Sequence, residues 1–423
     1  MRHKRKTHRA YITAAIVAFF AISYLVFYER ETIRVALETF TPQPGLSFTR
    51  TATSAPTSIA TPPKPIVVHL KTPVPVKAIY MSECAVGSKD YRQSILKILD
   101  TTELNSIVID IRDYTGKISF DTENPIIKDM VSDKCGATDM KEFLKELHDK
   151  NIYVIGRITT FQNPYYTKIH PDEAVQKKGG GVWKDRKGLA FVDVGAKPYW
   201  NTVVELAKES YNIGFDELNF DYIRFPSDGP MAEAVYSWDV GKTKQAALEE
   251  FFNYLHEKVS PMGVMSADLF GMVTTNYDDL NIGQQLERAM PYFDYIDPMV
   301  YPSHYPTGFN GYKDVNKHSY DIVHYSLSHA VARAVATTTT IGSLQYIVIA
   351  STSPKLYLKP SYPAKKIRPW LQSFDYPVEY TPEMVAAQIK ANEDAGLDSY
   401  LFWDPANKYR SLKAVVKPET SAQ

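Results

Sequence analysis

Short apolar runs alternate with longer stretches of helical periodicity along the chain from residue 76 onward. The runs are rich in β-branched and aromatic residues and have the length of buried strands. There are eight of them, at residues 77–82, 106–113, 152–159, 216–225, 263–270, 295–302, 367–374 and 399–405. The stretches between them include amphipathic segments that predict helices, at residues 140–151, 200–214, 243–260 and 381–396.

This alternation predicts βαβ units around a parallel sheet. Three of the helical stretches end in Asn151, Gly214 or Gly396 just before the next run, as helix C-caps do. Eight units favour a closed (β/α)8 TIM barrel over an open doubly wound sheet. No Gly-x-Gly-x-x-Gly turn follows the first run, which counts against a Rossmann fold.

Two stretches break this rhythm. Residues 171–198 carry three consecutive glycines at 179–181, and we expect this long connection to overhang the barrel mouth as a lid or wall. Residues 334–363 contain the apolar run SLQYIVIAS. We interpret that run either as a further strand or as a hairpin inserted into the barrel.

Polar and charged side chains gather near the C-terminal ends of the predicted strands. The active sites of (β/α)8 barrels lie at that face, and a charge inside a buried strand is costly unless it is paired or used. Capping of the following loops is the competing explanation for many of these side chains. They are Ser82, Glu83, Asp110, Arg112, Asp113, Arg157, Thr159, Asp221, Arg224, Asp268, Asp297, Tyr301, Gln372, Trp403 and Asp404.

The fourth run, residues 216–225, has two distinct faces because strand side chains alternate. The faces are Glu217, Asn219 and Asp221 on one side and Leu218, Phe220 and Tyr222 on the other. We expect the apolar face to pack against helices and the polar face to point into the barrel. Asp221 is then presented to the mouth, and Arg224 is placed to pair with a carboxylate or a sugar hydroxyl.

The segment GFDELNFDYIRFPSDG (214–229) resembles the hallmark of the putative glycosyl hydrolase domain family. These are exported bacterial barrels distantly similar to α-amylase-type glycosidases. The resemblance extends over residues 76–412 through VIDIRDYTG, YVIGRITTFQNP, YIDPMVYPSHY, IRPWLQSFDY and SYLFWDPANKY. It implies a (β/α)8 fold and a carbohydrate substrate, and it aligns Asp221 with the strand-four acid that serves as nucleophile in related glycosidases.

Glycoside hydrolysis uses two carboxyl groups, one that protonates the leaving oxygen and one that attacks carbon or activates water. Asp221 is the candidate nucleophile or base, and Asp268 at the end of the fifth run is the candidate acid. Related glycosidases often have Glu in the acid role, so Asp268 departs from their pattern, and Asp297 and Asp404 are the reserves.

Further residues are candidates for binding substrate. An ion-paired shell of Asp110, Arg112 and Asp113 would orient it, and aromatic side chains would stack on sugar rings. Packing is an equally good explanation for any single aromatic. The substrate-binding candidates are Tyr80, Asp110, Arg112, Asp113, Arg157, Asn219, Arg224, Asp297, Tyr301, His304, Gln372, Trp403 and Asp404, together with Trp370.

The N-terminal region predicts attachment to the cell membrane. Residues 1–10 are basic and should stay in the cytoplasm, and the uncharged residues 11–28 predict a single transmembrane signal anchor. A cleaved signal peptide is the alternative, but no clean small-x-small site follows. Residues 29–66, largely Thr, Ser, Pro and Ala from 41 onward, predict a flexible linker. Residues 67–415 then form an extracytoplasmic barrel, and 416–423 a disordered tail.

The two cysteines, Cys84 and Cys135, either form a disulfide or remain unpaired in this exported domain. The formal net charge is zero, which gives no argument for nucleic acid as a partner. With two cysteines and no HExxH segment, no metal or other cofactor is expected.

Three functions are compatible with these observations. The first is a hydrolase or transglycosylase acting on a polysaccharide of the cell envelope, and the second is a catalytically inactive barrel that binds carbohydrate. The third is another exported barrel enzyme, such as a deacetylase or a metal-assisted hydrolase. His170, His304 and His324 are too scattered along the sequence to suggest the metal ligands that the third function needs.

Overall fold

The computed structural model describes residues 67–418. The predicted cytoplasmic tail (1–10), signal anchor (11–28) and linker (29–66) lie outside the described residues, as do residues 419–423. Within 67–418, no helix has the length and apolar character needed to cross a membrane. The beginning of the predicted C-terminal tail is described, and its Lys417 carbonyl accepts a hydrogen bond from the Glu103 backbone N–H at 2.9 Å.

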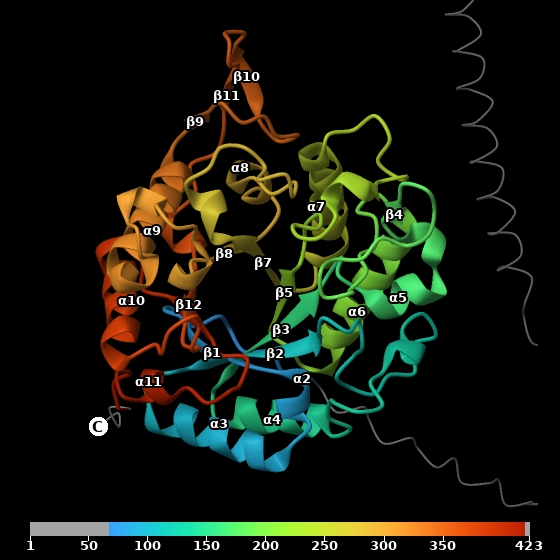
Figure 1. Ribbon diagram of the computed structural model, residues 1–423. Coiled ribbons are helices and arrows are strands. Elements are labelled where there is room, and N and C mark those ends of the chain that lie inside the picture. The colour runs from blue at the N-terminus through green and yellow to red at the C-terminus, as the bar shows by residue number, and fades with distance from the viewer. Residues whose placement is uncertain (1–66, 419–423) are drawn as a thin grey trace, which may run out of the picture. The chain divides into compact units, whose positions relative to one another are not determined.

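Eight parallel strands close into a barrel, as predicted (Figure 1). Neighbours around the barrel follow one another in sequence, and the last strand pairs with the first, with Lys77 opposite Tyr400. Each of the eight predicted runs contains one of these strands. The strands are β1 (Lys77–Met81), β2 (Ser106–Arg112), β3 (Tyr153–Thr159), β5 (Glu217–Asp221), β7 (Val264–Phe270), β8 (Tyr295–Met299), β12 (Trp370–Gln372) and β13 (Tyr400–Trp403).

Helices surround the barrel and cover its strands (Figure 1). The four predicted helical stretches are all helical. Gly214 ends the helix that precedes β5, and its positive φ (124°) is a conformation that suits glycine. The long helices are α3 (Lys89–Thr101), α4 (Met140–Asp149), α6 (Lys197–Ile213), α7 (Lys244–Val259), α9 (Ser319–Val335) and α10 (Pro382–Asp394). The short ones are α2 (Glu83–Val86), α5 (Pro164–Ile169), α8 (Leu286–Ala289) and α11 (Arg410–Lys413).

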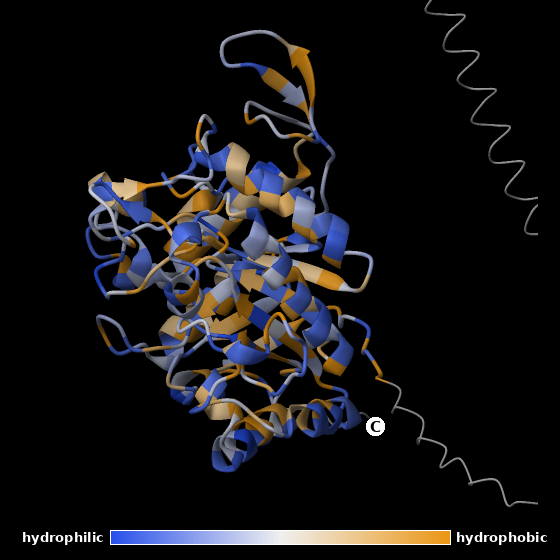
Figure 2. Ribbon diagram, turned by 90° about the vertical axis from the view of Figure 1, so that its right-hand side faces the viewer, coloured by the Kyte–Doolittle hydropathy of each residue, from blue (hydrophilic) through white to orange (hydrophobic). Residues whose placement is uncertain are grey.

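Apolar side chains form two separate clusters, one between strands and helices and one inside the barrel. Leu218 and Phe220 belong to the outer cluster, as the alternation in β5 predicts. The inner cluster contains Tyr80, Tyr153 and Trp370, so large aromatic side chains fill part of the barrel. Figure 2 shows hydrophobic residues along the central strands and hydrophilic residues along many of the surrounding helices.

Residues 334–363 form a small antiparallel sheet outside the barrel, which favours the inserted hairpin over a further barrel strand. Its strands are β9 (Thr338–Thr339), β10 (Ile347–Ala350) and β11 (Leu356–Leu358). The sheet projects from the body of the domain (Figure 1). The side chains of Leu344, Ile347 and Val348 on this projection are exposed.

The long connection after β3 also contains a short strand. Strand β4 (Gln176–Lys177) pairs antiparallel with β6 (Ala234–Val235) from the loop that follows β5. Trp183 is fully buried and donates to the Pro230 carbonyl at 3.1 Å, which fixes one loop on the other. Two loops at the mouth are therefore joined to each other.

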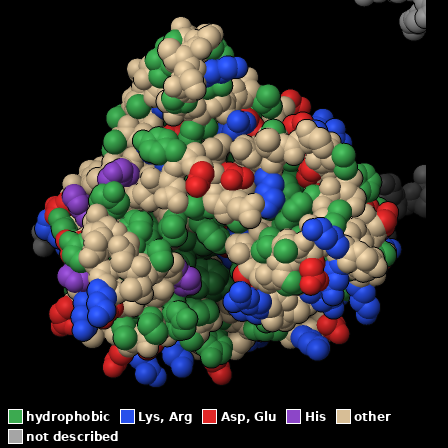
Figure 3. All heavy atoms as spheres, turned by 45° about the horizontal axis from the view of Figure 1, so that its top comes forward, with side chains coloured by type: hydrophobic (Ala, Val, Ile, Leu, Met, Phe, Trp, Pro, Cys, Tyr) green, Lys and Arg blue, Asp and Glu red, His purple; other side chains and the backbone are tan. Residues whose placement is uncertain are grey.

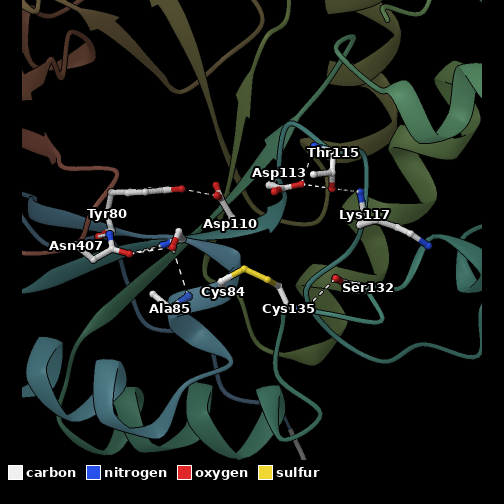
Figure 4. Close-up of a disulfide and its surroundings, with 11 residues drawn as sticks. Tyr80, Cys84, Ala85, Asp110, Asp113, Thr115, Lys117, Ser132, Cys135 and Asn407 are labelled. Atoms are coloured by element: carbon white, nitrogen blue, oxygen red, sulfur yellow. Dashed lines mark hydrogen bonds between the residues drawn. A yellow bond between two sulfur atoms is a disulfide. The ribbon is translucent and has the colours of Figure 1, made fainter. Parts of the chain in front are cut away.

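Cys84 and Cys135 form a disulfide, with Cα atoms 4.4 Å apart (Figure 4). The bridge connects α2, which follows β1, to the loop that follows β2. Beside it the backbones approach closely, because a Cβ at Gly87 would collide with the carbonyl oxygen of Gly136. The first two loops at the mouth are thus cross-linked.

Candidate active site

A cavity of about 1070 Å³ opens at the C-terminal ends of the strands. Figure 3 shows a hollow in the surface between groups of hydrophobic side chains. Both candidate catalytic acids lie on the cavity wall, with predicted substrate-binding residues from several strands. The predicted residues that line it are Arg157, Asp221, Arg224, Asp268, Tyr301, His304, Trp370, Trp403 and Asp404.

Asp221 ends β5 and is held by Arg157 from the neighbouring strand β3. Oδ2 of Asp221 accepts a hydrogen bond from Arg157 Nε at 3.1 Å and a second one from Nη2. The same guanidinium donates from Nη1 to Asp110 on β2 at 2.6 Å, and Asp110 also accepts from the Tyr80 hydroxyl on β1 at 2.5 Å (Figure 4). Four adjacent strands therefore position the Asp221 carboxylate.

Asp268 lies near the end of β7, beside β5, and is almost completely buried. Its Oδ1 accepts hydrogen bonds from Asn219 Nδ2 at 2.8 Å and from Trp370 Nε1 at 2.7 Å. Burial, together with the negative charges of Asp221 and Asp297, raises the pKa of Asp268 well above its ordinary value. These surroundings therefore favour the protonated form of Asp268.

The other oxygen of Asp268, Oδ2, has no hydrogen-bond partner within residues 67–418 and lies 3.8 Å from Arg157 Nε. A protonated carboxyl group carries its proton on one oxygen, and Oδ1 already accepts two N–H groups. The proton consequently belongs on Oδ2, where a substrate oxygen in the cavity could receive it.

The two acids face a common guanidinium. Because Asp221 Oδ2 and Asp268 Oδ2 lie 3.1 and 3.8 Å from the same Arg157 Nε, these oxygens are at most about 7 Å apart, within the reach of one glycosidic bond. Their environments differ, since Asp221 accepts two hydrogen bonds from Arg157, whereas Asp268 accepts hydrogen bonds only from Asn219 and Trp370 and has Arg157 at 3.8 Å. Two neighbouring carboxyl groups in different surroundings are the pattern of acid–nucleophile pairs.

Asp297 lies below the cavity, in the barrel interior, and does not reach the wall. It is ion-paired with Arg368, whose Nη2 lies 2.9 Å from Asp297 Oδ2. Arg368 also pairs with Glu217, and Asn219 Nδ2 donates to Asp297 at 3.1 Å. This buried layer supports Asp268 from beneath, so Asp297 is not brought to a position that touches substrate.

Six other predicted substrate-binding residues are not brought to the cavity wall. Tyr80, Asp110 and Asn219 are three of them, and they hold Arg157 and Asp268 from behind the wall. Arg112 is fully buried and donates to the carbonyl oxygens of Thr159 and Thr160 at 2.9 and 3.3 Å. Asp113 accepts from the Thr115 backbone N–H at 2.8 Å, in the loop after β2. Gln372 joins loops, because it accepts from Ser303 Oγ at 2.8 Å and donates to the carbonyls of Phe374 and Tyr376.

Asp404 lies on the cavity wall but its oxygens are occupied. They accept hydrogen bonds from the backbone N–H groups of Ala406, Lys408 and Tyr409, each at 2.9 Å. The carboxylate thus shapes the loop that follows β13. This is the loop-capping role that the sequence left open for acidic residues at strand ends.

Aromatic side chains form the remaining walls. Trp403 stacks on Tyr80 with ring centroids 3.9 Å apart. Across the cavity mouth, the Tyr301 and Phe374 rings meet edge to face at 5.6 Å. Burial and the positive charge of Lys187 lower the pKa of His304, so its ring is neutral at neutral pH.

Several wall residues had no signal in the sequence pattern because they belong to loops. Lys187 comes from the long connection after β3, which supports the prediction that this segment forms part of a wall. Other wall residues from loops and their short helices are Met272, Tyr305, Phe374, Tyr376, Glu379, Lys408 and Arg410, whereas Phe270 and Met299 are the last residues of β7 and β8. Tyr222, which was expected to pack against helices, packs against the outer cluster and also lines the cavity, with a positive φ (47°) directly after Asp221.

Among residues 67–418, no group of three or more His, Cys, Asp or Glu side chains is arranged to hold a metal ion.

A closed parallel barrel with acids and aromatic side chains around a cavity at its strand ends is the architecture of (β/α)8 enzymes. Residues 78–409 match the family described as putative glycosyl hydrolase domain, and the chain belongs to this family. Membership identifies the protein as an enzyme of the glycoside hydrolase type.

Solved structures include several similar barrels. The glycoside hydrolase domain of PgaB (BpsB) from Bordetella bronchiseptica has a TM-score of 0.54 and 13% identity, and the match covers 82% of this chain and 100% of that domain. A hypothetical protein from Ruminiclostridium thermocellum is 32% identical, covering 48% of this chain and 98% of its own, with a TM-score of 0.42. The α-galactosidase TtGalA from Thermus thermophilus is 11% identical, covering 81% and 61%, with a TM-score of 0.46. No curated protein matches the chain.

Proposed function

We propose that the protein hydrolyses glycosidic bonds of a polysaccharide in the cell envelope, with Asp221 as nucleophile or base and Asp268 as general acid. The observation that carries this proposal is the pair itself. One carboxylate is ion-paired with Arg157, and a second carboxyl group, whose pKa is raised by burial, lies within about 7 Å of it on the same cavity wall.

The roles follow from the surroundings of each acid. Glycosidic cleavage needs a proton on the leaving oxygen, and the raised pKa of Asp268 favours the form that can donate one from Oδ2. It also needs a carboxylate near the anomeric carbon, and Asp221 is the carboxyl group that Arg157 holds at the cavity wall. Trp370 and Asn219 fix the orientation of Asp268, so that proton transfer takes place along one direction.

Two features support a position outside the cytoplasm. The Cys84–Cys135 disulfide suits an oxidising compartment. The predicted anchor and linker in residues 11–66 would keep the barrel at the membrane, within reach of envelope polysaccharides.

The experiment is a screen for reducing-sugar release by the full-length chain in detergent micelles, on bacterial envelope and plant polysaccharides. Asp221→Asn and Asp268→Asn are measured in parallel, and Asp133→Asn is the matched control, because that aspartate is exposed and far in sequence from both acids. We expect both active-site variants to lose at least about a hundredfold in kcat/KM and the control to lose nothing.

Full activity of Asp221→Asn would refute the assignment of the nucleophile. Glycan binding without release by the wild-type chain would instead establish the catalytically inactive binding barrel. The anomeric configuration of the first product, followed by NMR, shows whether Asp221 attacks carbon with net retention or activates water with inversion.

A further inference from the structure

Arg224 has surroundings unlike those of the catalytic residues. It follows β5 by three residues, its side chain lines the cavity, and only 6% of its surface is exposed. The guanidinium lies over the rings of Tyr222 and Phe270, at 4.8 and 4.6 Å from their centroids. One of its nitrogens, Nη1, donates to the Phe225 carbonyl at 2.9 Å. The side chain is therefore held firmly with its remaining donors toward the cavity.

The positive charge of Arg224 lacks a carboxylate partner. Within residues 67–418, no acidic oxygen lies within 4.0 Å of it, and its Nε and Nη2 make no hydrogen bond. Asp221, Asp228 and Asp185 attract it from beyond 4.0 Å. Asp221 is already bound by Arg157, and Asp185 accepts from the backbone N–H groups of its own loop, whereas Asp228 is half-buried beyond ion-pair distance. A buried charge without a partner is costly, and a ligand that supplies the partner would offset that cost.

Other buried arginines show how this chain ordinarily satisfies such a group. Arg157, Arg333 and Arg368 are each ion-paired with a carboxylate. Arg112 has none, but it donates to backbone carbonyls away from the cavity. Arg224 differs from all four, because it faces the cavity with donors that nothing in the described part of the chain accepts.

A second cation lies on the same cavity wall. Lys187, from the connection after β3, lines the cavity and is itself exposed. Its positive charge helps to lower the pKa of His304, which lines the same cavity. Lys187 has no acidic partner within 4.0 Å in residues 67–418 either. Lys408 and Arg410 line the cavity too, so Arg224 and Lys187 belong to a group of cations available for an anionic ligand.

We propose that the cavity binds a sugar unit bearing a carboxylate, of the uronic acid type, and that Arg224 is the residue that recognises this group. The guanidinium presents Nε and Nη2 side by side, the arrangement that binds a carboxylate through two parallel hydrogen bonds. Arg224 follows the strand that carries Asp221, so the acidic sugar would lie next to the scissile bond. This inference rests on the proposed function and names its substrate class.

The test compares acidic polysaccharides with their own carboxyl-reduced forms, in which each carboxylate has become a primary alcohol. Polygalacturonate, alginate and hyaluronan serve as probes. Binding to the full-length chain is measured by affinity electrophoresis, and sugar release is measured on the same samples. We expect at least one acidic polymer to bind about tenfold more tightly than its reduced form, as a charge-assisted bidentate contact implies.

Variants then assign the effect to one side chain. Arg224→Met, which keeps the length but removes the charge, should abolish the preference for the acidic form. Arg224→Lys should retain part of it. Arg186→Met removes one positive charge from an exposed position outside the cavity wall and should leave the preference unchanged. Circular dichroism of each variant confirms folding, and the wild-type comparison needs no variant at all.

The outcomes separate the two proposals. Preferential binding of an acidic polymer without sugar release supports the inference and contradicts hydrolysis. Sugar release with equal binding of both forms supports hydrolysis and overturns the inference. Binding to none of the acidic polymers, or a preference that Arg224→Met leaves intact, also overturns it.

Discussion

Removal of the Cys84–Cys135 disulfide gives the most direct quantitative test of the structure. The two residues are 51 positions apart. Closing a loop of that length in the unfolded chain lowers its entropy, which corresponds to about 4 kcal/mol of native-state stability. Cys84 is exposed and Cys135 is half-buried, so replacing both removes little packing.

We therefore expect Cys84→Ala/Cys135→Ala to lower the free energy of unfolding by about 2–4 kcal/mol. For a domain of this size, that loss corresponds to a fall of about 5 °C in the thermal midpoint. Calorimetry and urea unfolding of the full-length chain measure it, with the wild-type chain in dithiothreitol as a second route to the same state.

Two further results are expected if the disulfide acts on the unfolded chain. Dithiothreitol should destabilise the wild-type chain by the same amount as the double substitution, and it should have no effect on the double variant. A midpoint that changes by less than about 1 °C in both experiments would show that the cross-link does not restrict the unfolded chain as assumed.

Three other substitutions test particular interactions. Asp297→Asn removes a negative charge that raises the pKa of Asp268, so the alkaline limb of the kcat/KM profile should move to lower pH. Burial and the neighbouring Asp113 raise the pKa of Glu83 to about 8. The folded state therefore keeps a proton that the unfolded state releases above about pH 4.3. The free energy of unfolding consequently falls as the pH rises from about 4.3 to about 8. Glu83→Gln should reduce the difference between the free energies of unfolding at pH 5 and pH 8, which urea unfolding measures. Asp404→Ala removes the acceptor of three backbone N–H groups and should cost about 2–3 kcal/mol in thermal unfolding.

The barrel could be predicted from the sequence because its strands are buried on both faces. Such strands are continuous apolar runs, and the eight runs all contain barrel strands. The bounds of a strand are less well predicted than its presence. The seventh predicted run, residues 367–374, contains a strand of only three residues, Trp370–Gln372. Arg368, just before it, forms ion pairs in the barrel interior with residues far away in sequence, which no local pattern reveals.

The candidate site was predictable only where it belongs to the strands. Asp221 and Asp268 could be placed at the mouth by alternation and by position along their strands. The contact of Tyr222 with the cavity could not be predicted, because this residue follows the strand with a positive φ that strand alternation does not describe. Loop residues such as Lys187 reach the cavity through backbone conformations that hydrophobic periodicity does not encode. The contact between Trp370 and Asp268 joins residues 102 positions apart.

Closure of the barrel by its first and last strands imposes an order on biosynthesis. The Val76 backbone donates to Ser399, 323 residues later, so β1 must wait for nearly the whole chain before it has its second neighbour. Until then β1 and β12 are sheet edges with unpaired backbone groups, which readily pair with other chains. A ribosome that stops before residue 400 would release an open sheet prone to aggregation, whereas the disulfide can already form once Cys135 has emerged. The early cross-link can thus hold the first two strands together while the rest of the chain is still being made.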